Sequence, residues 1–314
     1  MGDSSTVVAV DLGGTTIKAA RINAQGGAEE RLRVPTPAGD GSEAVLAAVA
    51  ETAAALTRPG TVAVGLCAPG LIDRATGVVR FAANLRLYDA PLARTVADRT
   101  RLPVTLEHDV RAATLAEQRL GSGNGCRDLL VVVLGTGVAA GIVSGGVLIG
   151  GAQAMAGEFG HICVHADGEL CQCGQRGCVE AYAAARAVVD RYRRHGKHAD
   201  SAADVTARLK CDPAAAGVWA EATDALGRAL AMTTVLLDPE KIVLAGGMSV
   251  AGPLLSEPVR TALQRRLAWR SAPPVEISPL GADAGLFGAA LHALETTEAF
   301  TFTELTPEPA LGGR

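Results

Sequence analysis

The sequence predicts an α/β fold built from two similar halves, and three observations support this prediction. A strand, a glycine turn and a second strand occur together at residues 7–22. The same arrangement returns at residues 129–143. Between them, a strand at residues 102–106 leads into a helical stretch. Two such units, each opening a mixed α/β segment, indicate a duplicated fold whose halves face each other across a cleft.

The first glycine turn joins two strand-like runs. Val7–Val10 is β-branched and leads into the turn segment Asp11–Thr16, after which Ile17–Ile22 alternates as a second strand. Consecutive N–H groups in such a turn form an anion nest, and the hydroxyls of Thr15 and Thr16 add donors. A phosphate group is therefore the expected guest, with Lys18 supplying a point charge.

The second glycine turn repeats this plan. Strands are expected at Leu129–Leu134 and Val138–Val143, joined by a turn that contains Thr136, and a third strand is expected at residues 147–149. A dinucleotide-binding fingerprint is the alternative, because glycines follow an apolar strand. It fails on spacing, and the chain continues after Gly141 as strand and turn where that motif needs a helix.

Two acids and a histidine stand where the middle strand becomes a helix. Glu107, His108 and Asp109 follow the strand and precede the helical stretch 110–120. A carboxylate in this position is held ionised by local N–H groups and faces the crevice at the strand ends. Asp109 could equally be a plain N-cap, which is the commoner role of an isolated Asp.

A cluster of metal-ligand residues is the most specific motif of the chain. One histidine and three cysteines fall within residues 161–178, and glycines beside the cysteines allow a tight knuckle. Three thiolates and one imidazole suit a closed, structural Zn²⁺ site. The predicted ligands are His161, Cys171, Cys173 and Cys178.

Two carboxylates flank this cluster. Glu158 precedes the histidine by three residues, and Glu180 follows the last cysteine by two. A bound zinc ion would fix both carboxylates and the ring of His161, three groups able to hydrogen-bond a polyhydroxylated ligand. The zinc is thus expected to act as a scaffold for recognition.

Other interpretations of the cysteines are less favoured. Polar residues are interleaved with them, which argues against simple buried apolar residues, and seven cysteines, an odd number without a secretory leader, argue against a disulfide framework. The remaining cysteines lack ligand spacing and are expected to be packing residues. They are Cys67, Cys126, Cys163 and Cys211.

Composition limits the function classes. The chain has 314 residues, of which 48% are hydrophobic and 20% charged, and a net charge of -4. A chain of this length suggests two domains, and its charge gives no reason to expect nucleic acid as a partner. Residues 129–157 carry no charge but are broken by glycines, so we expect no membrane span and a cytoplasmic protein.

Together these motifs resemble the ROK (repressor, open reading frame, kinase) sugar kinases, and the match runs from about residue 6 to 295. The cysteine motif is highly specific to that family, whereas the glycine turns are shared with the wider actin, hexokinase and Hsp70-like fold. The motifs that carry the resemblance are Asp11-x-Gly13-Gly14-Thr15, Ala68-Pro69-Gly70, Glu107-x-Asp109, Gly135-Thr136-Gly137, Glu158-x-Gly160-His161, the cysteine motif ending in Glu180, and Gly246-Gly247.

The resemblance implies an ATP-dependent hexose kinase, most often glucokinase, with a two-domain actin-like ATPase (ribonuclease H-like) fold and an interdomain active site. A small α/β domain would span 1–118, joined by a C-terminal helix at about 283–298. A large domain with the zinc motif would span 119–282, and 299–314 would be a flexible tail. Family members suggest a homodimer or homotetramer.

The resemblance also implies a role for each matched residue. Asp109 would be the general base that takes the proton of the sugar 6-hydroxyl as it attacks ATP, which Mg²⁺ accompanies. The implied sugar ligands are Gly70, Asn84, His108, Asp109, Glu158, His161 and Glu180. The implied nucleotide ligands are Asp11, Gly13, Gly14, Thr15, Thr16, Lys18, Gly135, Thr136, Gly137, Gly246 and Gly247.

Two departures from the family pattern bear on the substrate. Many members have Asn where this chain has His108, and that Asn helps bind the hydroxyls next to the reacting one. Ala139 and Ala140 stand where glycines are usual and would crowd the nucleotide. Glucose is the expected substrate, and glucosamine, kanosamine or an N-acylated hexosamine are the alternatives. Whether ATP alone is the phosphate donor stays open.

Two functions of another class remain. Some family members are sugar-sensing repressors with a helix-turn-helix domain ahead of the first turn, but here that turn begins at Asp11 and no basic face is evident. A catalytically inactive sugar sensor is the other hypothesis. The presence of Asp109 and of both glycine turns argues for an enzyme.

Overall fold

The structure is a computed structural model that describes residues 5–23 and 25–297, so the predicted tail at 299–314 lies outside the described residues. The chain divides into two compact units. The first consists of the described residues of Met1–Leu120, Gly151–Met155 and Asp283–Arg314, and the second of Gly121–Gly150 and Ala156–Ala282. The domain limits drawn from the sequence stay a prediction.

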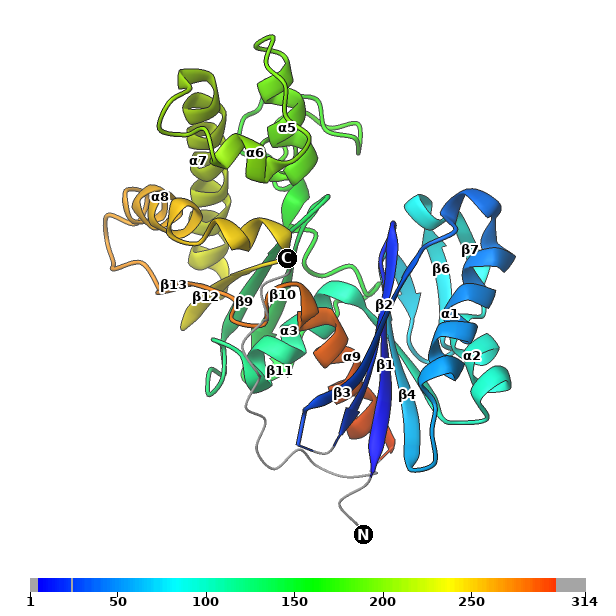
Figure 1. The fold of residues 1–314 in the computed structure, drawn as a ribbon. Coiled ribbons are helices and arrows are strands. Elements are labelled where there is room, and N and C mark those ends of the chain that lie inside the picture. Colours follow the sequence, from blue (N-terminus) through cyan, green and yellow to red (C-terminus); the bar gives the residue numbers. More distant parts are fainter. Residues whose placement is uncertain (1–4, 24, 298–314) are drawn as a thin grey trace. The chain divides into compact units, whose positions relative to one another are not determined.

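The first unit contains two sheets and the helices around them (Figure 1). Its strands are β1 (Thr6–Leu12), β2 (Thr16–Asn23), β3 (Ala28–Pro35), β4 (Thr61–Ala68), β5 (Leu71–Asp73), β6 (Val78–Ala82), β7 (Leu87–Ala90) and β8 (Val104–His108). Its helices are η1 (Ala38–Asp40), α1 (Ser42–Leu56), η2 (Ala83–Leu85), α2 (Leu92–Thr100), α3 (Asp109–Leu120) and α9 (Ala284–Thr297), and the single turn η5 (Gly281–Asp283) precedes α9.

The main sheet of this unit has the order β3-β2-β1-β4-β8. Strands β1, β4 and β8 are parallel, and β2 and β3 are antiparallel to their neighbours. Alternate residues of β1 point to opposite faces. Val8 and Val10 pack with α1 and α2, whereas Val7 and Ala9 pack with α3 and α9. Figure 1 shows α1 and α9 on opposite sides of β1.

Helix α9, at the end of the described chain, packs against one face of this sheet. At Gly65 of β4, an added Cβ would lie 2.0 Å from the carbonyl oxygen of Ala289 in α9. At Gly288 it would lie 1.8 Å from the carbonyl oxygen of Ala112 in α3. Glycines at these two points therefore let the helix backbone approach both neighbours directly.

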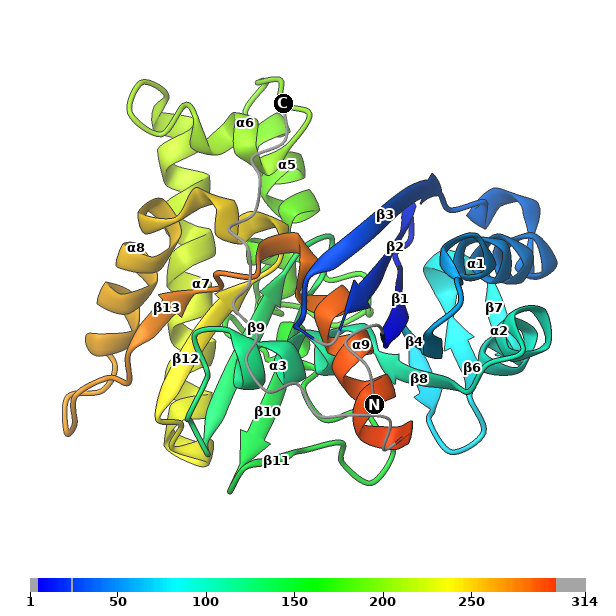
Figure 2. The same cartoon turned by 60° about the horizontal axis from the view of Figure 1, so that its bottom comes forward.

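The second unit contains one five-stranded sheet and the helices around it (Figure 2). Its strands are β9 (Leu129–Leu134), β10 (Val138–Ser144), β11 (Val147–Leu148), β12 (Lys241–Ala245) and β13 (Val275–Ile277). Its helices are η3 (Phe159–His161), α4 (Glu180–Ala183), α5 (Ala185–Arg193), α6 (Ala202–Thr206), α7 (Pro213–Leu237), η4 (Gly247–Ala251) and α8 (Pro253–Gln264).

The sheet of the second unit has the order β11-β10-β9-β12-β13. Strands β9, β12 and β13 are parallel, and β10 and β11 are antiparallel to their neighbours. One face carries Leu130, Val132 and Leu134, which pack against α7 and α8. Both five-stranded sheets therefore have the same order and the same strand directions, which confirms the predicted duplication.

Most predicted strands agree with the structure. The two strands of each glycine-turn unit and the short third strand are present. The middle strand begins later than predicted, at Val104. Within the described part of the chain, no helix is both long and apolar enough to cross a bilayer.

Candidate active site

The predicted site residues of the first unit lie at the carboxyl ends of three parallel strands. Asp11 stands near the end of β1, Gly70 follows β4, and Asp109 follows β8. Because neighbouring parallel strands end at one edge of a sheet, the three residues share that edge. Burial raises the pKa of Asp11, Lys18 opposes this rise, and the nearby charge of Asp109 adds to it. The two carboxylates are thus electrostatic neighbours.

The first glycine turn is tightly closed. The N–H of Gly13 donates to the carbonyl of Thr16 at 3.1 Å, and the hydroxyl of Thr36 donates to the carbonyl of Gly13 at 2.7 Å. An added Cβ on Gly14 would lie 3.0 Å from Nδ2 of Asn84. The predicted sugar ligand Asn84 therefore lies directly against the predicted phosphate turn.

Lys18 does not stand apart as an isolated positive charge. Its Nζ lies 3.4 Å from Oδ2 of Asp11.

At Gly70, φ is +101° and an added Cβ would lie 2.2 Å from the carbonyl oxygen of Phe81. The loop after β4 is thus held against β6, the strand that leads to Asn84.

Asp109 is the first residue of α3, and its carboxylate is partly exposed. Oδ1 accepts a hydrogen bond from the N–H of Val110 at 2.7 Å and lies 3.4 Å from Nδ1 of His108. An N-cap would instead bond to the second or third helical N–H. Oδ2 has no hydrogen-bond partner among the described residues, so one oxygen is held in place and the other can accept a proton.

Glu107 anchors the start of α3 from beneath. It is 2% exposed and accepts hydrogen bonds from the N–H of His108 at 2.7 Å and from Nε of Arg111 at 2.8 Å. Nε of Arg74 lies 2.9 Å from its other oxygen. These contacts fix the backbone on both sides of Asp109. In the sequence, Glu107 is recognisable only as a motif residue, because its partner Arg74 is distant along the chain.

This ion pair leads to a prediction about stability. Glu107→Gln should lower the free energy of unfolding by about 2 kcal/mol, because it leaves the guanidinium of Arg111, which is 4% exposed, without its charged partner. Denaturant unfolding measures the effect. Glu51→Gln is the matched control, because Glu51 pairs with Arg99 on the exposed surface of the same unit and should change little. Equal stability of the two variants would contradict the prediction.

The second glycine turn also lies at the carboxyl ends of parallel strands. Residues 135–137 follow β9, and Gly246 and Gly247 follow its neighbour β12. The N–H of Gly135 donates to the carbonyl of Gly137 at 2.9 Å. Gly246 has φ +84°, and an added Cβ would lie 2.5 Å from the carbonyl of Leu134. The two predicted nucleotide segments of this unit are therefore adjacent.

Of Ala139 and Ala140, the two alanines expected to crowd a nucleotide, Ala140 is buried in the core. It is 3% exposed and belongs to the buried core of the second unit. Only Ala139 remains as a possible nucleotide contact.

The four predicted metal ligands come together in the second unit. Their ligand atoms all lie within 4.8 Å of one another. The sulfurs of Cys173 and Cys178 are 3.7 Å apart, and Sγ of Cys171 is 3.9 Å from Nδ1 of His161. Thiolates about 2.3 Å from a tetrahedral zinc ion stand about 3.8 Å apart, so the spacing suits zinc. Burial, reinforced by Cys173, raises the pKa of Cys178 to about 12, an effect that a bound cation reverses.

His161 can serve the metal and a ligand with different atoms. Its Nδ1 faces the sulfur of Cys171, whereas its Nε2 lies 3.7 Å from Oε2 of Glu158. The two roles predicted for His161 are therefore compatible. Glu158 itself is half exposed.

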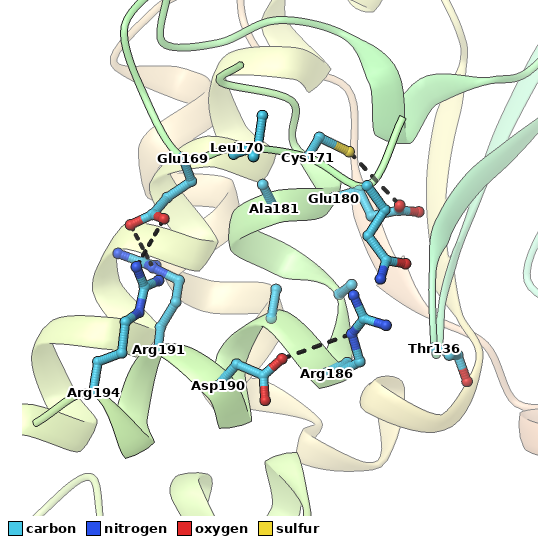
Figure 3. A pocket seen from close by; sticks show the side chains of 13 residues that line it. Thr136, Glu169, Leu170, Cys171, Glu180, Ala181, Arg186, Asp190, Arg191 and Arg194 are labelled. Atoms are coloured by element: carbon cyan, nitrogen blue, oxygen red, sulfur yellow. Dashed lines mark hydrogen bonds and ion pairs between the residues drawn. The ribbon is translucent and has the colours of Figure 1, made fainter. Parts of the chain in front are cut away.

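Glu180 lies between the cysteine cluster and the second glycine turn. Its Oε1 is 3.9 Å from Sγ of Cys171, and its Oε2 accepts a hydrogen bond from the N–H of Val138 at 3.0 Å. A pocket of about 120 Å³ in this unit is lined by Glu180, Cys171 and Thr136 and by Arg186, Arg191 and Arg194, whose side chains are drawn in Figure 3. Predicted sugar, metal and phosphate ligands thus share one pocket.

The interpretation of the remaining cysteines is wrong for two of them. Cys163 and Cys211 are exposed, whereas Cys67 is buried as expected. Sγ of Cys67 lies 3.5 Å from Oδ1 of Asp11, and burial raises the pKa of this thiol well above its usual value. Cys67 therefore supports Asp11 as well as filling the core. Nothing in its spacing could have revealed this contact.

Comparison with known proteins identifies the family. The sequence model of the ROK family matches residues 7–296. The chain belongs to the ROK family. A glucokinase of Streptomyces coelicolor is 37% identical over 313 residues, which cover 92% of this chain and 97% of that protein.

Solved structures of ROK proteins share the fold. A ROK hexokinase of Thermus thermophilus is 35% identical with a TM-score of 0.81, covering 94% of this chain and 100% of that one. A ROK glucokinase of Streptomyces griseus in complex with glucose and AMPPNP is 33% identical with a TM-score of 0.81, covering 93% and 100%. The predicted actin-like ATPase fold of the ROK kinases is thereby confirmed.

Proposed function

We propose that this ROK protein transfers the γ-phosphoryl group of ATP to the 6-hydroxyl of glucose. Its relatives support an ATP-dependent sugar kinase, since one is a glucokinase and another was solved with glucose and an ATP analogue. The assignment to this chain rests on the geometry of the Asp109 carboxylate. Its Oδ1 accepts a hydrogen bond from Val110, whereas its Oδ2 has no hydrogen-bond partner among the described residues.

Asp109 acts as the general base in this proposal. Its Oδ2 takes the proton of the attacking hydroxyl, while the bond from Val110 and the anchored start of α3 keep the carboxylate oriented. Phosphoryl transfer asks for little covalent chemistry from the protein, so the rate depends on positioning and on charge stabilisation. Exclusion of water prevents hydrolysis of ATP from competing.

The two glycine turns bind the phosphates of ATP. Their backbone N–H groups and the hydroxyls of Thr15 and Thr136 are donors suited to phosphate oxygens. The largely buried carboxylate of Asp11, which lies 3.4 Å from Nζ of Lys18, offers the hard oxygen ligands that Mg²⁺ prefers. The ion neutralises negative charge on the nucleotide when bound.

The sugar hydroxyls are held in this proposal by residues around the cysteine cluster, and Asn84 is a further proposed sugar ligand. Glu158, Nε2 of His161 and Glu180 provide acceptors and a donor for neighbouring hydroxyls. The ring of His161 and the thiolates of Cys171, Cys173 and Cys178 would hold a structural zinc ion, which would keep His161 and the segment that carries Glu180 in place without taking part in the chemistry.

A panel of hexoses tests the proposal directly. ADP release should be strongly stimulated by glucose and should depend on Mg²⁺ and ATP. The panel includes mannose, glucosamine, kanosamine and N-acetylated hexosamines, with polyphosphate as an alternative donor. Sugar binding without any stimulated ADP release would favour an inactive sensor and remove the kinase.

His108 is the residue we expect to set the choice of sugar. Its ring lies 3.4 Å from Asp109 through Nδ1, so it stands beside the reacting hydroxyl in this proposal. His108→Asn should raise the ratio of kcat/KM for glucose over an amino sugar by about tenfold, the worth of one hydrogen bond. Steady-state kinetics on both sugars measure the ratio, and an unaltered ranking would make His108 a bystander.

A further inference from the structure

The second glycine turn is tied to the segment that follows the last cysteine. Oε2 of Glu180 accepts a hydrogen bond from the N–H of Val138 at 3.0 Å. The N–H of Ala185, at the start of α5, donates to the carbonyl of Gly135 at 2.9 Å. The turn is therefore held at both of its ends by one short stretch of chain.

Glu180 also lies close to Gly137, which is inside the turn. An added Cβ at this position would lie 2.7 Å from Oε2 of Glu180. This is closer than a carbon and an oxygen approach without a shift of one of them, so an alanine at this position would push the carboxylate of Glu180 away from the turn.

The other oxygen of the same carboxylate faces the metal cluster. Oε1 lies 3.9 Å from Sγ of Cys171, the contact drawn as a dashed line in Figure 3. Cys178 lies two residues before Glu180, at the approach to α4. One side chain thus spans the distance from the metal-binding knuckle to the phosphate turn.

We propose that Glu180 is a positioning residue for the donor nucleotide: it holds the second glycine turn in the shape that binds phosphate, in addition to contacting the sugar. The inference rests on the proposed function for the identity of the two ligands. Its consequence is that the knuckle orders the sites of both substrates through one carboxylate.

Glu180 has two opposing effects on the binding of a phosphate. Its negative charge opposes binding of a phosphate, whereas its hydrogen bond to Val138 keeps the turn closed. Glu180→Gln removes the charge and keeps an oxygen acceptor. Glu180→Ala removes both, so a comparison of the two variants isolates the hydrogen bond.

ADP binding without sugar, measured by calorimetry, is the test. The Glu180→Ala variant should bind ADP about fivefold to tenfold more weakly than Glu180→Gln, the worth of one hydrogen bond. Gly137→Ala should weaken ADP binding by about tenfold in the natural chain, and much less when combined with Glu180→Ala. Equal ADP affinity of the Ala and Gln variants would overturn the inference.

Glu169→Gln is the matched control. Glu169 lines the same pocket, and its carboxylate pairs with Arg194 at 2.9 Å, away from the turn. This variant should bind ADP as the natural chain does. Zinc content and melting temperature check that each variant is folded. If Glu180→Ala does not fold, Gly137→Ala alone tests the inference. Unchanged ADP affinity of the Gly137→Ala variant would also overturn it. A natural chain that binds no ADP would instead refute the proposed function.

Discussion

Replacement of Asp109 by Asn is expected to lower kcat for glucose phosphorylation by about a hundredfold or more, the scale of a lost general base. Asn keeps the shape of the side chain and can still accept the hydrogen bond from Val110. It cannot take the proton of the sugar hydroxyl at the second oxygen. Glucose affinity should therefore remain within about twofold while turnover falls.

The measurement combines steady-state kinetics with calorimetric titration of glucose. Asp98→Asn is a suitable control, because Asp98 is an exposed carboxylate on α2 of the same unit. It should leave both kcat and glucose affinity unchanged. Near-normal turnover of the Asp109 variant would remove this residue from the role of base, and parallel loss of glucose affinity would indicate a binding role instead.

Loss of one cysteine ligand should have a comparably large effect. Cys173→Ala should abolish stoichiometric zinc binding and lower kcat/KM for glucose by about a hundredfold, because the ion orders the residues that recognise the sugar. The expectation rests on the 3.7 Å spacing between Cys173 and Cys178 and on the place of Glu180 beside Cys171. Zinc analysis of protein purified without added metal should give about one ion per natural chain.

Cys163→Ala provides the matched control for this experiment. Cys163 is exposed and lies beside the knuckle, where its thiol contacts the carbonyl of Arg176, but it is outside the predicted ligand set. Its variant should retain both zinc and activity. If the Cys173 variant loses zinc but keeps its glucose affinity, the metal would be disconnected from recognition.

Local patterns in the sequence were sufficient to predict the elements that are built from neighbouring residues. The strands on either side of each glycine turn form hairpins, so residues close in sequence determine them. The metal cluster was predictable for the same reason, since His161 and Cys178 lie within one short segment. In both cases the types and spacing of nearby residues were enough to predict the feature.

Contacts between distant segments were beyond reach of the sequence. The pairing of β1 with β4 and of β4 with β8 brings Asp11 and Asp109 to one edge, and no local pattern specifies which strands become neighbours. The supports of the site were missed for this reason. Glu107 is paired with Arg74 and Cys67 with Asp11, contacts that exist only after the sheet has formed.

The position of α9 has a consequence for the way this protein is made. The helix packs against β1, β4 and α3, yet it is synthesised after the whole of the second unit. Until it leaves the ribosome, the face of the sheet around Gly65 and Cys67 lacks its cover. The second unit can therefore complete its folding during translation, whereas the first must wait for the final helix, and a prematurely terminated chain would expose apolar surface to chaperones and proteases.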